Sequence, residues 1–367
     1  MGRCRSTAES PIAVQVLDTA TRLVRIGTMR TYATPVRCFL AALALGGLLT
    51  APAAAQKGSS EAPRPDPAIV QDYDPDPAIW LVEDEDTKLY LLGTFHVLPE
   101  GFRWRSALLN GIVDQADELI VESSEEDISD APIMARMVAA IGKRKPVSEQ
   151  LSPQNRPKWF AMAKVLGIEA EQFDRMPPLM LMFGLGNALG GDASTGASVE
   201  YGVETVLEAA FRAAGKPIGS IENAGDVLSS LLDIDEPTLI KELDRELSRW
   251  DAKSIGAAAT HKPGAAGEAA AMQAMLSTEH SWARGEEVDL SAEFAGAPGV
   301  SALFGKRLLD NRNAAWAAWI EQRLAEPGTA LIAVGAGHLW GKGSVQDMLA
   351  RRGIQAERLN SGRSSGG

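Results

Sequence analysis

Two apolar, strand-like runs of this chain end in the same short pattern, Gly-x-x-His. Residues 89–96 read LYLLGTFH, and residues 330–338 read ALIAVGAGH. The chain has four histidines, and two of them, His96 and His338, stand in this one context. Imidazole is the commonest metal ligand and the usual acid–base group near neutral pH, and a nearby glycine lets the backbone turn sharply beside a ligand. The pattern therefore predicts one site that is assembled from both ends of a domain.

The residues around His96 predict a β-hairpin that continues into a βαβ unit. Two apolar runs, 78–82 and 88–94, flank a short polar turn, as the two strands of a hairpin do. An amphipathic helical pattern over residues 104–116 comes next, and the short apolar strand 118–122 follows it. Strands that are joined by a crossover helix are parallel, and the crossover is right-handed. The first long strand and the strand 118–122 are therefore expected to end at the same edge of a sheet.

A carboxylate, Glu122, stands at the end of the second of these strands. A further apolar strand, 329–334, precedes His338, and if it is parallel and close by, both histidines and Glu122 converge at the edge where α/β sheets bind ligands. Two imidazoles and one carboxylate make a three-ligand metal set that leaves room for water. The alternative for Glu122 is the start of a solvated acidic loop. Mixed nitrogen and oxygen ligands suit Zn, Mn, Co or Fe, and the spacing does not choose among them.

Other polar residues give weaker signals. Arg312 and Asn313 offer donors suited to a carboxylate or an oxyanion, and the alternative is a helix start with surface charges. Glu200 is expected on a helix surface, whereas for Glu204, four residues later, a supporting and a surface role both stay open. The two remaining histidines, His261 and His280, are interpreted as non-catalytic.

The centre of the chain is predicted to be mainly helical, inserted into a mixed α/β fold in which helices flank a central mixed β-sheet. A short strand, 217–222, interrupts the helices, and residues 257–271 are rich in Ala and Gly, as a loop is. Methionines at helical spacing are more often adaptable core than the wall of a substrate groove. The candidate helices are 132–142, 153–167, 178–189, 199–214, 236–250 and 269–284. After them, helix 303–324, strand 329–334, helix 345–352 and strand 354–359 complete the fold.

The N-terminal region has the features of a secretory signal peptide. Arg30 and Arg37 precede a short apolar run over 38–49, and small residues follow up to Ala55. The run is shorter than the ~20 residues of a membrane span, so no stable span is expected after cleavage. Met29 is a candidate for the true start. We expect a signal region at 1–55, an extended leader at 56–77, a single domain at 78–360 and a disordered tail at 361–367.

Charge and cysteine content narrow the function further. The formal net charge is −12 at pH 7, and the signal region is itself basic, so the exported part is more acidic still. Such a surface argues against nucleic-acid binding and against adhesion to anionic lipid. Both cysteines, Cys4 and Cys38, precede Ala55, which leaves the exported part without disulfides or thiolate ligands.

Several segments together resemble the TraB/GumN family. These are LLGTFHVLP at 91–99 with DELIVE at 117–122, GVE at 202–204 with GKPI at 215–218, SIEN at 220–223, RNAAW at 312–316 and VGAGHL at 334–339. The resemblance extends over about 79–359. One Gly-x-x-His is a weak signal, whereas two of them, with Glu122 and the RNxxW segment, are specific in combination. The family's middle segment often carries Asp at the position of Glu204.

The resemblance implies a sheet flanked by helices and a divalent-metal site built from His96, Glu122 and His338. Together with the residues, it predicts a periplasmic or secreted metal-dependent hydrolase that acts on a peptide or protein, with Arg312 and Asn313 assisting. Two alternatives remain: a non-catalytic binding protein for a peptide or haem, and a degenerate member without turnover. The substrate and the oligomeric state stay open.

Overall fold

The computed structural model describes residues 69–123, 145–165, 168–179, 197–249, 276–287 and 305–359. The predicted signal region with Met29, the tail 361–367, the helix 132–142 and the loop 257–271 with His261 lie outside these ranges, as do most of the helix 178–189 and the first part of the helix 269–284. Among the helices that are described, none is both long enough and apolar enough to cross a lipid bilayer.

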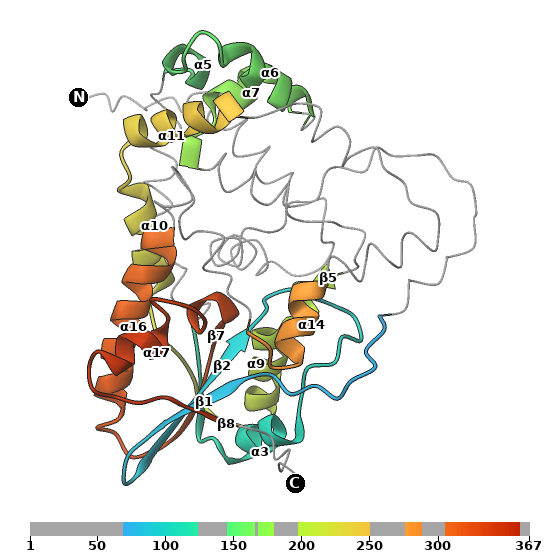
Figure 1. Ribbon diagram of the computed structural model, residues 1–367, viewed down its shortest axis with the longest axis vertical. Coiled ribbons are helices and arrows are strands. Elements are labelled where there is room, and N and C mark those ends of the chain that lie inside the picture. The colour runs from blue at the N-terminus through green and yellow to red at the C-terminus, as the bar shows by residue number, and fades with distance from the viewer. Residues whose placement is uncertain are drawn as a thin grey trace, which may run out of the picture.

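A six-stranded mixed sheet is the centre of the fold (Figure 1), in the order β6-β4-β7-β2-β1-β8. Its strands are β1 Ile79–Glu83, β2 Thr87–Thr94, β4 Glu118–Val121, β6 Ile218–Ser220, β7 Gly328–Gly335 and β8 Glu357–Leu359. The four strands from β6 to β2 run parallel, and β1 and β8 are added to them by antiparallel pairing. A separate two-stranded ribbon joins β3 (Leu98–Pro99) to β5 (Ala197–Ser198).

The predicted hairpin β1–β2 is confirmed, and β2 and β4 are parallel as the βαβ pattern predicts. They are not neighbours, because β7 lies between them and pairs with both. The segment 330–335 of β7 is buried throughout. A strand that is apolar on both faces is most stable in the middle of a parallel sheet with helices on each side, and this places the second Gly-x-x-His segment directly beside the first.

Helices cover both faces of the sheet. On one face lie α3 (Ala107–Gln115), α9 (Val203–Ala213) and α14 (Ser277–Ala283), which pack against alternate sheet residues such as Leu119 and Leu331. On the other face lie α16 (Asn311–Arg323) and α17 (Val345–Ala350), packed against Ile120 and Ile332. Successive strand residues point to opposite faces, so each strand contributes to both cores. The predicted α/β class is confirmed.

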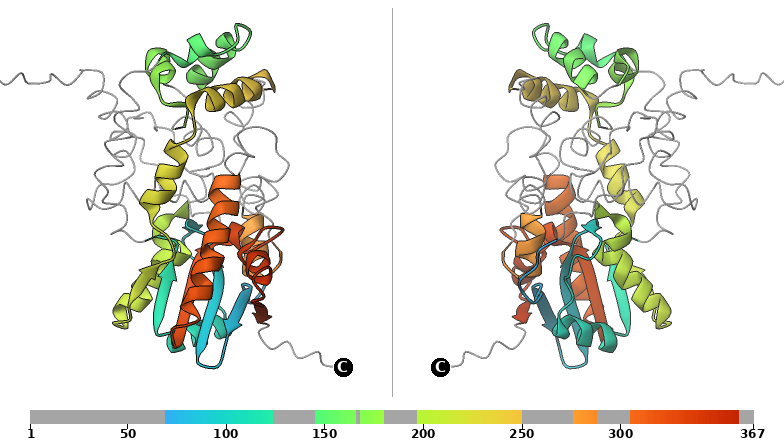
Figure 2. Two further views of the ribbon diagram at one scale, coloured as in Figure 1. Left: turned by 90° about the vertical axis from the view of Figure 1, so that its left-hand side faces the viewer. Right: turned by 90° about the vertical axis from the view of Figure 1, so that its right-hand side faces the viewer.

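The middle of the chain forms a second helical cluster. It consists of α5 (Val147–Gln150), α6 (Arg156–Val165), α7 (Ala170–Arg175) and α11 (Glu236–Arg249) and is packed around Trp159 and Phe173. Figures 1 and 2 show this cluster at the end of the molecule away from the sheet, with α10 (Ala224–Leu232) between the two. Met162 and Met176 belong to its apolar core, which favours the core interpretation for these methionines.

Local chemistry explains where two helices differ from their predicted lengths. The helix expected over 199–214 is divided at Gly202 into a 3-10 turn η3 (Val199–Tyr201) and α9. The helix expected over 303–324 begins with a π-helical turn, η5 (Lys306–Asp310), before α16. A π turn inserts one extra residue in each turn and changes which side chains face the core, and here it precedes Arg312 and Asn313 directly.

The end of the predicted leader is extended and is attached to the domain. Over 69–77 it forms no helix or strand. The Asp76 N–H donates to the carbonyl of Ala283 at 2.7 Å, and the Tyr73 hydroxyl lies 2.7 Å from Nδ1 of His280. These bonds join the leader to α14.

Candidate functional site

Four polar residues follow the carboxyl ends of four neighbouring strands. Glu222 follows β6, Glu122 follows β4, His338 follows β7 through a 3-10 turn, η6 (Ala336–His338), and His96 follows β2. Because these strands are parallel and consecutive in the sheet, their carboxyl ends lie along one edge. The convergence predicted for His96, Glu122 and His338 follows from this topology, with Glu222 as a further member.

Glu122 is buried between Gly335 at the end of β7 and Arg312 of α16. Its Oε1 accepts the N–H of Gly335 at 2.6 Å, and its Oε2 accepts Nη2 of Arg312 at 2.7 Å. Only 7% of the residue is exposed, so Glu122 is not part of a solvated loop. Burial alone raises the pKa of this carboxyl, but the charge of Arg312, aided by both histidines and the Gly335 N–H, lowers the pKa to about 2. Glu122 is therefore anionic throughout the physiological range.

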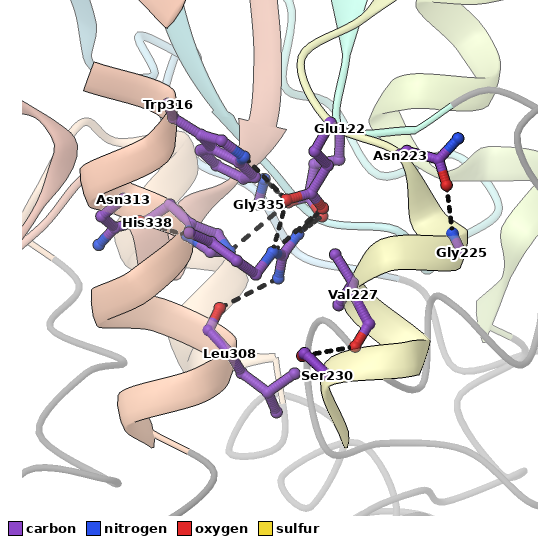
Figure 3. A network of polar contacts seen from close by, with 12 residues as sticks. Glu122, Asn223, Gly225, Val227, Ser230, Leu308, Asn313, Trp316, Gly335 and His338 are labelled. Atoms are coloured by element: carbon purple, nitrogen blue, oxygen red, sulfur yellow. Dashed lines mark hydrogen bonds and ion pairs between the residues drawn. The ribbon is translucent and has the colours of Figure 1, made fainter. Parts of the chain in front are cut away.

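Side chains of α16 hold the ring of His338 in place. Its Nδ1 lies 2.6 Å from Oδ1 of Asn313, whose Nδ2 donates to the carbonyl of Gly343 at 2.8 Å. Since the amide nitrogen is engaged by a carbonyl, its oxygen faces the ring and receives the Nδ1–H. The ring also packs against Trp316 with centroids 4.2 Å apart (Figure 3). Burial and the Arg312 charge lower the pKa of His338 to about 3, so the ring is neutral and Nε2 carries a lone pair.

Nε2 of His338, the ring nitrogen with the lone pair, lies near Glu122. Nε2 of His338 is buried without a hydrogen-bond partner and lies 3.8 Å from Oε1 of Glu122. A buried acceptor that has no partner is costly, and such a group is a common sign of a missing ligand or ion.

His96 has a different partner and a different charge. Its Nδ1 lies 2.8 Å from Oε1 of Glu204 in the first turn of α9, and the Thr94 hydroxyl donates to the same oxygen. Nε2 of His96 is buried and has no hydrogen-bond partner. Burial lowers the pKa of His96, but the charge and hydrogen bond of Glu204 outweigh it and raise the pKa to about 9. The two histidines therefore differ in protonation state at neutral pH.

Arg312 connects Glu122 to Glu222. Nε of Arg312 lies 2.9 Å and Nη2 lies 2.5 Å from the Glu222 carboxylate, while Nη1 donates to the carbonyl of Leu308 at 3.1 Å. Glu222 also accepts the indole N–H of Trp316 at 2.8 Å. Burial, with Glu122 close by, raises the pKa of Glu222 despite the Arg312 charge. Arg312 and Asn313 are thus buried at the start of α16 rather than on the surface, and their polar groups bind to protein groups.

The side chains border one small space above Gly335. A methyl group built on Gly335 would lie 2.9 Å from Oε1 of Glu122 and 4.0 Å from Nε2 of His96, with the His338 ring 3.7 Å away. Only glycine at this position therefore avoids crowding Oε1 of Glu122 where the carboxylate and the two histidines meet.

Comparison with known proteins gives a family. The model of the TraB/PrgY/gumN family matches residues 78–358, most of the chain. The chain belongs to this family. A curated relative, the uncharacterized protein YbaP of Escherichia coli (strain K12), is 24% identical over 277 residues, which is 74% of this chain and 92% of that protein. No solved structure matches. The family predicted from the sequence is thereby confirmed.

The family resemblance implies a divalent metal, and the donors at this edge fit one in kind. Two imidazole Nε2 atoms without partners and one anionic carboxylate are a mixed nitrogen and oxygen set. The 3.8 Å between Nε2 of His338 and Oε1 of Glu122 is compatible with a shared ion, since two bonds of about 2.0–2.2 Å allow at most about 4.4 Å. As the side chains stand, no three His, Cys, Asp or Glu of the described ranges are close enough to hold a metal. Binding by all three residues would therefore require a side-chain movement.

Two residues of the site were not identified as members from the sequence. Glu222 was recognised only as part of the SIEN segment, although it stands just past a strand end, as Glu122 does. For Glu204 the sequence leaves a supporting and a surface role both open, because its partner His96 lies far away along the chain. Glu200 is exposed, as expected, and His280 lies on α14, with Tyr73 and Phe102 as ring neighbours.

Gly202 allows α9 to reach His96. A Cβ on Gly202 would lie 2.0 Å from the carbonyl oxygen of His96. Gly202→Ala is therefore expected to destabilise the protein by about 1–3 kcal/mol through overpacking, measured by urea unfolding. Gly111→Ala in α3 is the control, because a Cβ there meets nothing within 4 Å, and it should stabilise by up to about 1 kcal/mol. Equal behaviour of the two variants would contradict a close packing of α9 on His96.

Proposed function

We propose that this chain is an exported, metal-dependent hydrolase, and that its substrate is a peptide or protein. The observation that carries the proposal is the pair of buried, unpartnered Nε2 atoms of His96 and His338, which border the same space as Glu122. In metal sites, a ligating histidine commonly gives its other ring nitrogen to a carboxylate or a carbonyl group, which orients the ring. Glu204 and the Asn313 amide do so here.

His96, Glu122 and His338 would hold the ion. When bound there, a divalent metal supplies Lewis acidity, which polarises a substrate carbonyl and makes water acidic. Arg312 keeps Glu122 ionised and in place through its 2.7 Å ion pair. His338 is neutral and ready to donate a lone pair, whereas His96 must first lose the proton on Nε2, since Nδ1–H stays with Glu204. Metal binding is therefore accompanied by proton release.

Arg312 and Asn313 contribute by positioning. Each already has its polar atoms on protein groups, so the arrangement supports a role in orienting Glu122 and His338 rather than in contacting the substrate. The export part of the proposal rests on the basic and apolar N-terminal pattern at 30–55. Sequencing the N-terminus of the exported protein tests it, and a chain that still begins upstream of residue 38 would contradict cleavage.

Metal content and peptide cleavage test the enzyme proposal. The purified protein, loaded separately with Zn²⁺, Mn²⁺, Co²⁺ or Fe²⁺, is assayed against a mixture of peptides, and products are identified by mass spectrometry. His96→Ala and His338→Ala should lose both bound metal and cleavage, since each removes a nitrogen ligand. Chelation should abolish cleavage in the wild type, and adding the metal back should restore it.

His280→Gln is the matched control for these two variants. His280 is buried, and its Nε2 also has no partner, but it lies on α14 with its ring against Tyr73 and Phe102 and does not follow a strand of the sheet. It should keep metal and activity. Unchanged metal content and cleavage in both His96→Ala and His338→Ala would end the proposal. Saturable peptide binding with intact peptide recovered would favour a binding protein, and a Soret band on haem titration, lost in a histidine variant, would favour haem capture.

A further inference from the structure

We infer that Glu204 is a positioning residue that fixes the ring of His96 with Nε2 directed into the site. The orientation of the His96 ring is argued from its contacts with other residues of this chain and does not require a bound metal. The consequence for a bound metal rests on the proposed function. Glu204 contacts Nδ1 of His96, the ring nitrogen opposite the one that lies near Gly335, so it acts through His96.

The contacts of Glu204 tie α9 to the end of β2. Its Oε1 lies 2.8 Å from Nδ1 of His96 and also accepts a hydrogen bond from the hydroxyl of Thr94. The side chain is only 12% exposed, and Thr94 is fully buried. A carboxylate in such a place is costly unless it is paired, and its pairing is with the histidine of the site.

The backbone around Glu204 reinforces the same attachment. The N–H of Val203 donates to the carbonyl of Phe95 at 3.0 Å, and Gly202 packs directly on the carbonyl of His96. The first turn of α9 is therefore attached to the segment 94–96 by main chain and side chain together. Glu204 has little freedom to turn away from His96.

A comparison of the two histidines shows what this attachment achieves. His338 has Nδ1 on the amide of Asn313 from α16, and His96 has Nδ1 on the carboxylate of Glu204 from α9. These helices cover opposite faces of the sheet. Each layer thus orients one ring, and in both rings the nitrogen left free is Nε2, buried beside the same space. Without Glu204, the His96 ring could rotate and present either nitrogen.

The experiment measures the ring of His96 and the binding of metal separately. Histidine labelled with ¹⁵N is introduced into the full chain, and His96 is assigned by comparison with His96→Gln. A proton held in the buried bond between Nδ1 and Glu204 gives a far-downfield, slowly exchanging resonance in the metal-free protein. Zn²⁺ alone is then titrated by calorimetry into the same samples, and thermal unfolding reports whether each variant is folded.

Three variants separate the possible roles. Glu204→Ala should lose the downfield resonance of His96 and bind Zn²⁺ about 10–100-fold more weakly, the usual effect of losing a group that orients a ligand. Glu204→Gln keeps an acceptor of the same size, so it should keep the ring orientation and lose less affinity. Glu200→Ala, at an exposed position one turn earlier, should change neither.

The outcomes distinguish this inference from the proposed function. If Glu204→Ala is folded and keeps both the resonance and the Zn²⁺ affinity of the wild type, Glu204 does not position His96. If Glu204→Ala does not fold, Glu204→Gln decides: a lost resonance would overturn the inference, and a retained one supports it. If the wild type binds none of Zn²⁺, Mn²⁺, Co²⁺ and Fe²⁺ while the resonance depends on Glu204, the metal proposal fails and the positioning of His96 stands.

Discussion

Arg312→Met is expected to destabilise the protein by about 3–5 kcal/mol, the usual effect of removing one partner from a buried ion pair. Arg312 lies between Glu122 and Glu222, and all three side chains are almost inaccessible to solvent. Without the guanidinium, two carboxylates of the same edge would be buried close together with no opposite charge between them. Urea unfolding of the metal-free protein measures the change.

A second arginine of the same helix provides the control. Arg323 stands near the end of α16 and pairs with Glu118 at the beginning of β4, whereas Arg312 pairs with Glu122 just past the end of that strand. The Glu118 side chain is 25% exposed, against 9% for Glu122. Solvent screens the Arg323–Glu118 pair more strongly than the Arg312–Glu122 pair, so Arg323→Met should lower the free energy of unfolding by only about 1 kcal/mol.

Neutralising the two carboxylates that Arg312→Met leaves unpaired should restore stability. In the background of Arg312→Met, Glu122→Gln and Glu222→Gln convert the two carboxylates to neutral amides of the same shape. Together they are expected to recover a large part of the lost stability, because the penalty comes from uncompensated buried charge. The assignment of Arg312 as the neutralising group is refuted if Arg312→Met and Arg323→Met cost the same, or if the glutamine substitutions recover nothing.

The stability of the metal-free protein is expected to fall on both sides of neutral pH, for reasons that differ between the two histidines. His96 has a folded-state pKa of about 9, above its ordinary 6.5. Its contribution is complete below pH 6.5 and is lost as the pH rises through 9, because the folded state binds the proton more tightly. A shift of this size corresponds to roughly 3 kcal/mol.

His338 and Glu122 act on the acid side. The folded-state pKa of His338 is about 3 and that of Glu122 about 2, below their ordinary 6.5 and 4.5. The unfolded chain therefore takes up protons first, so the contribution of His338 falls below pH 6.5 and that of Glu122 below pH 4.5. Together they are expected to remove several kcal/mol between pH 6.5 and pH 2.

Urea unfolding from pH 3 to 10 in the presence of a chelator measures both limbs. His96→Gln should flatten the alkaline limb and leave the acid limb, whereas His338→Gln should flatten the acid limb above pH 4.5. His280→Gln serves as the control for the alkaline limb, because burial lowers the pKa of His280 rather than raising it, so its loss should leave that limb unchanged. An alkaline limb that persists unchanged in His96→Gln would show that the His96–Glu204 pair does not cause it.

Local patterns were sufficient to predict the elements of the sheet domain. Alternating and continuous apolar runs mark β1, β2, β4 and β7, and the helical spacing of apolar residues marks α3 and α16, since hydrophobic periodicity is set within a few residues. The sequence patterns miss the short elements α5, α7, β3 and β5, because a few residues carry little periodic signal, and they miss the longer helix α10 as well. The family follows from combined segments, and the match over 78–358 agrees with it.

Local sequence patterns could not predict which strands pair with each other or which side chains meet across the fold. That β7 would insert between β2 and β4 depends on contacts between residues far apart in the chain. Arg312 was interpreted as a group for substrate or oxyanion because its donors suit either, but whether those donors are free depends on Glu122 and Glu222, which come from two other strands.

Local apolar patterns place His96, Glu122 and His338 at the ends of strands, and the βαβ pattern predicts that the strands before His96 and Glu122 are parallel. Only the tertiary structure shows that the strand before His338 is parallel as well and lies between the other two, because that pairing joins residues far apart in the chain. The tertiary structure alone decided that Glu204 holds His96, that Asn313 holds His338 and that Arg312 binds both carboxylates. These contacts depend on how α9 and α16 pack on opposite faces of the sheet. The contacts in turn set the charge that each histidine carries.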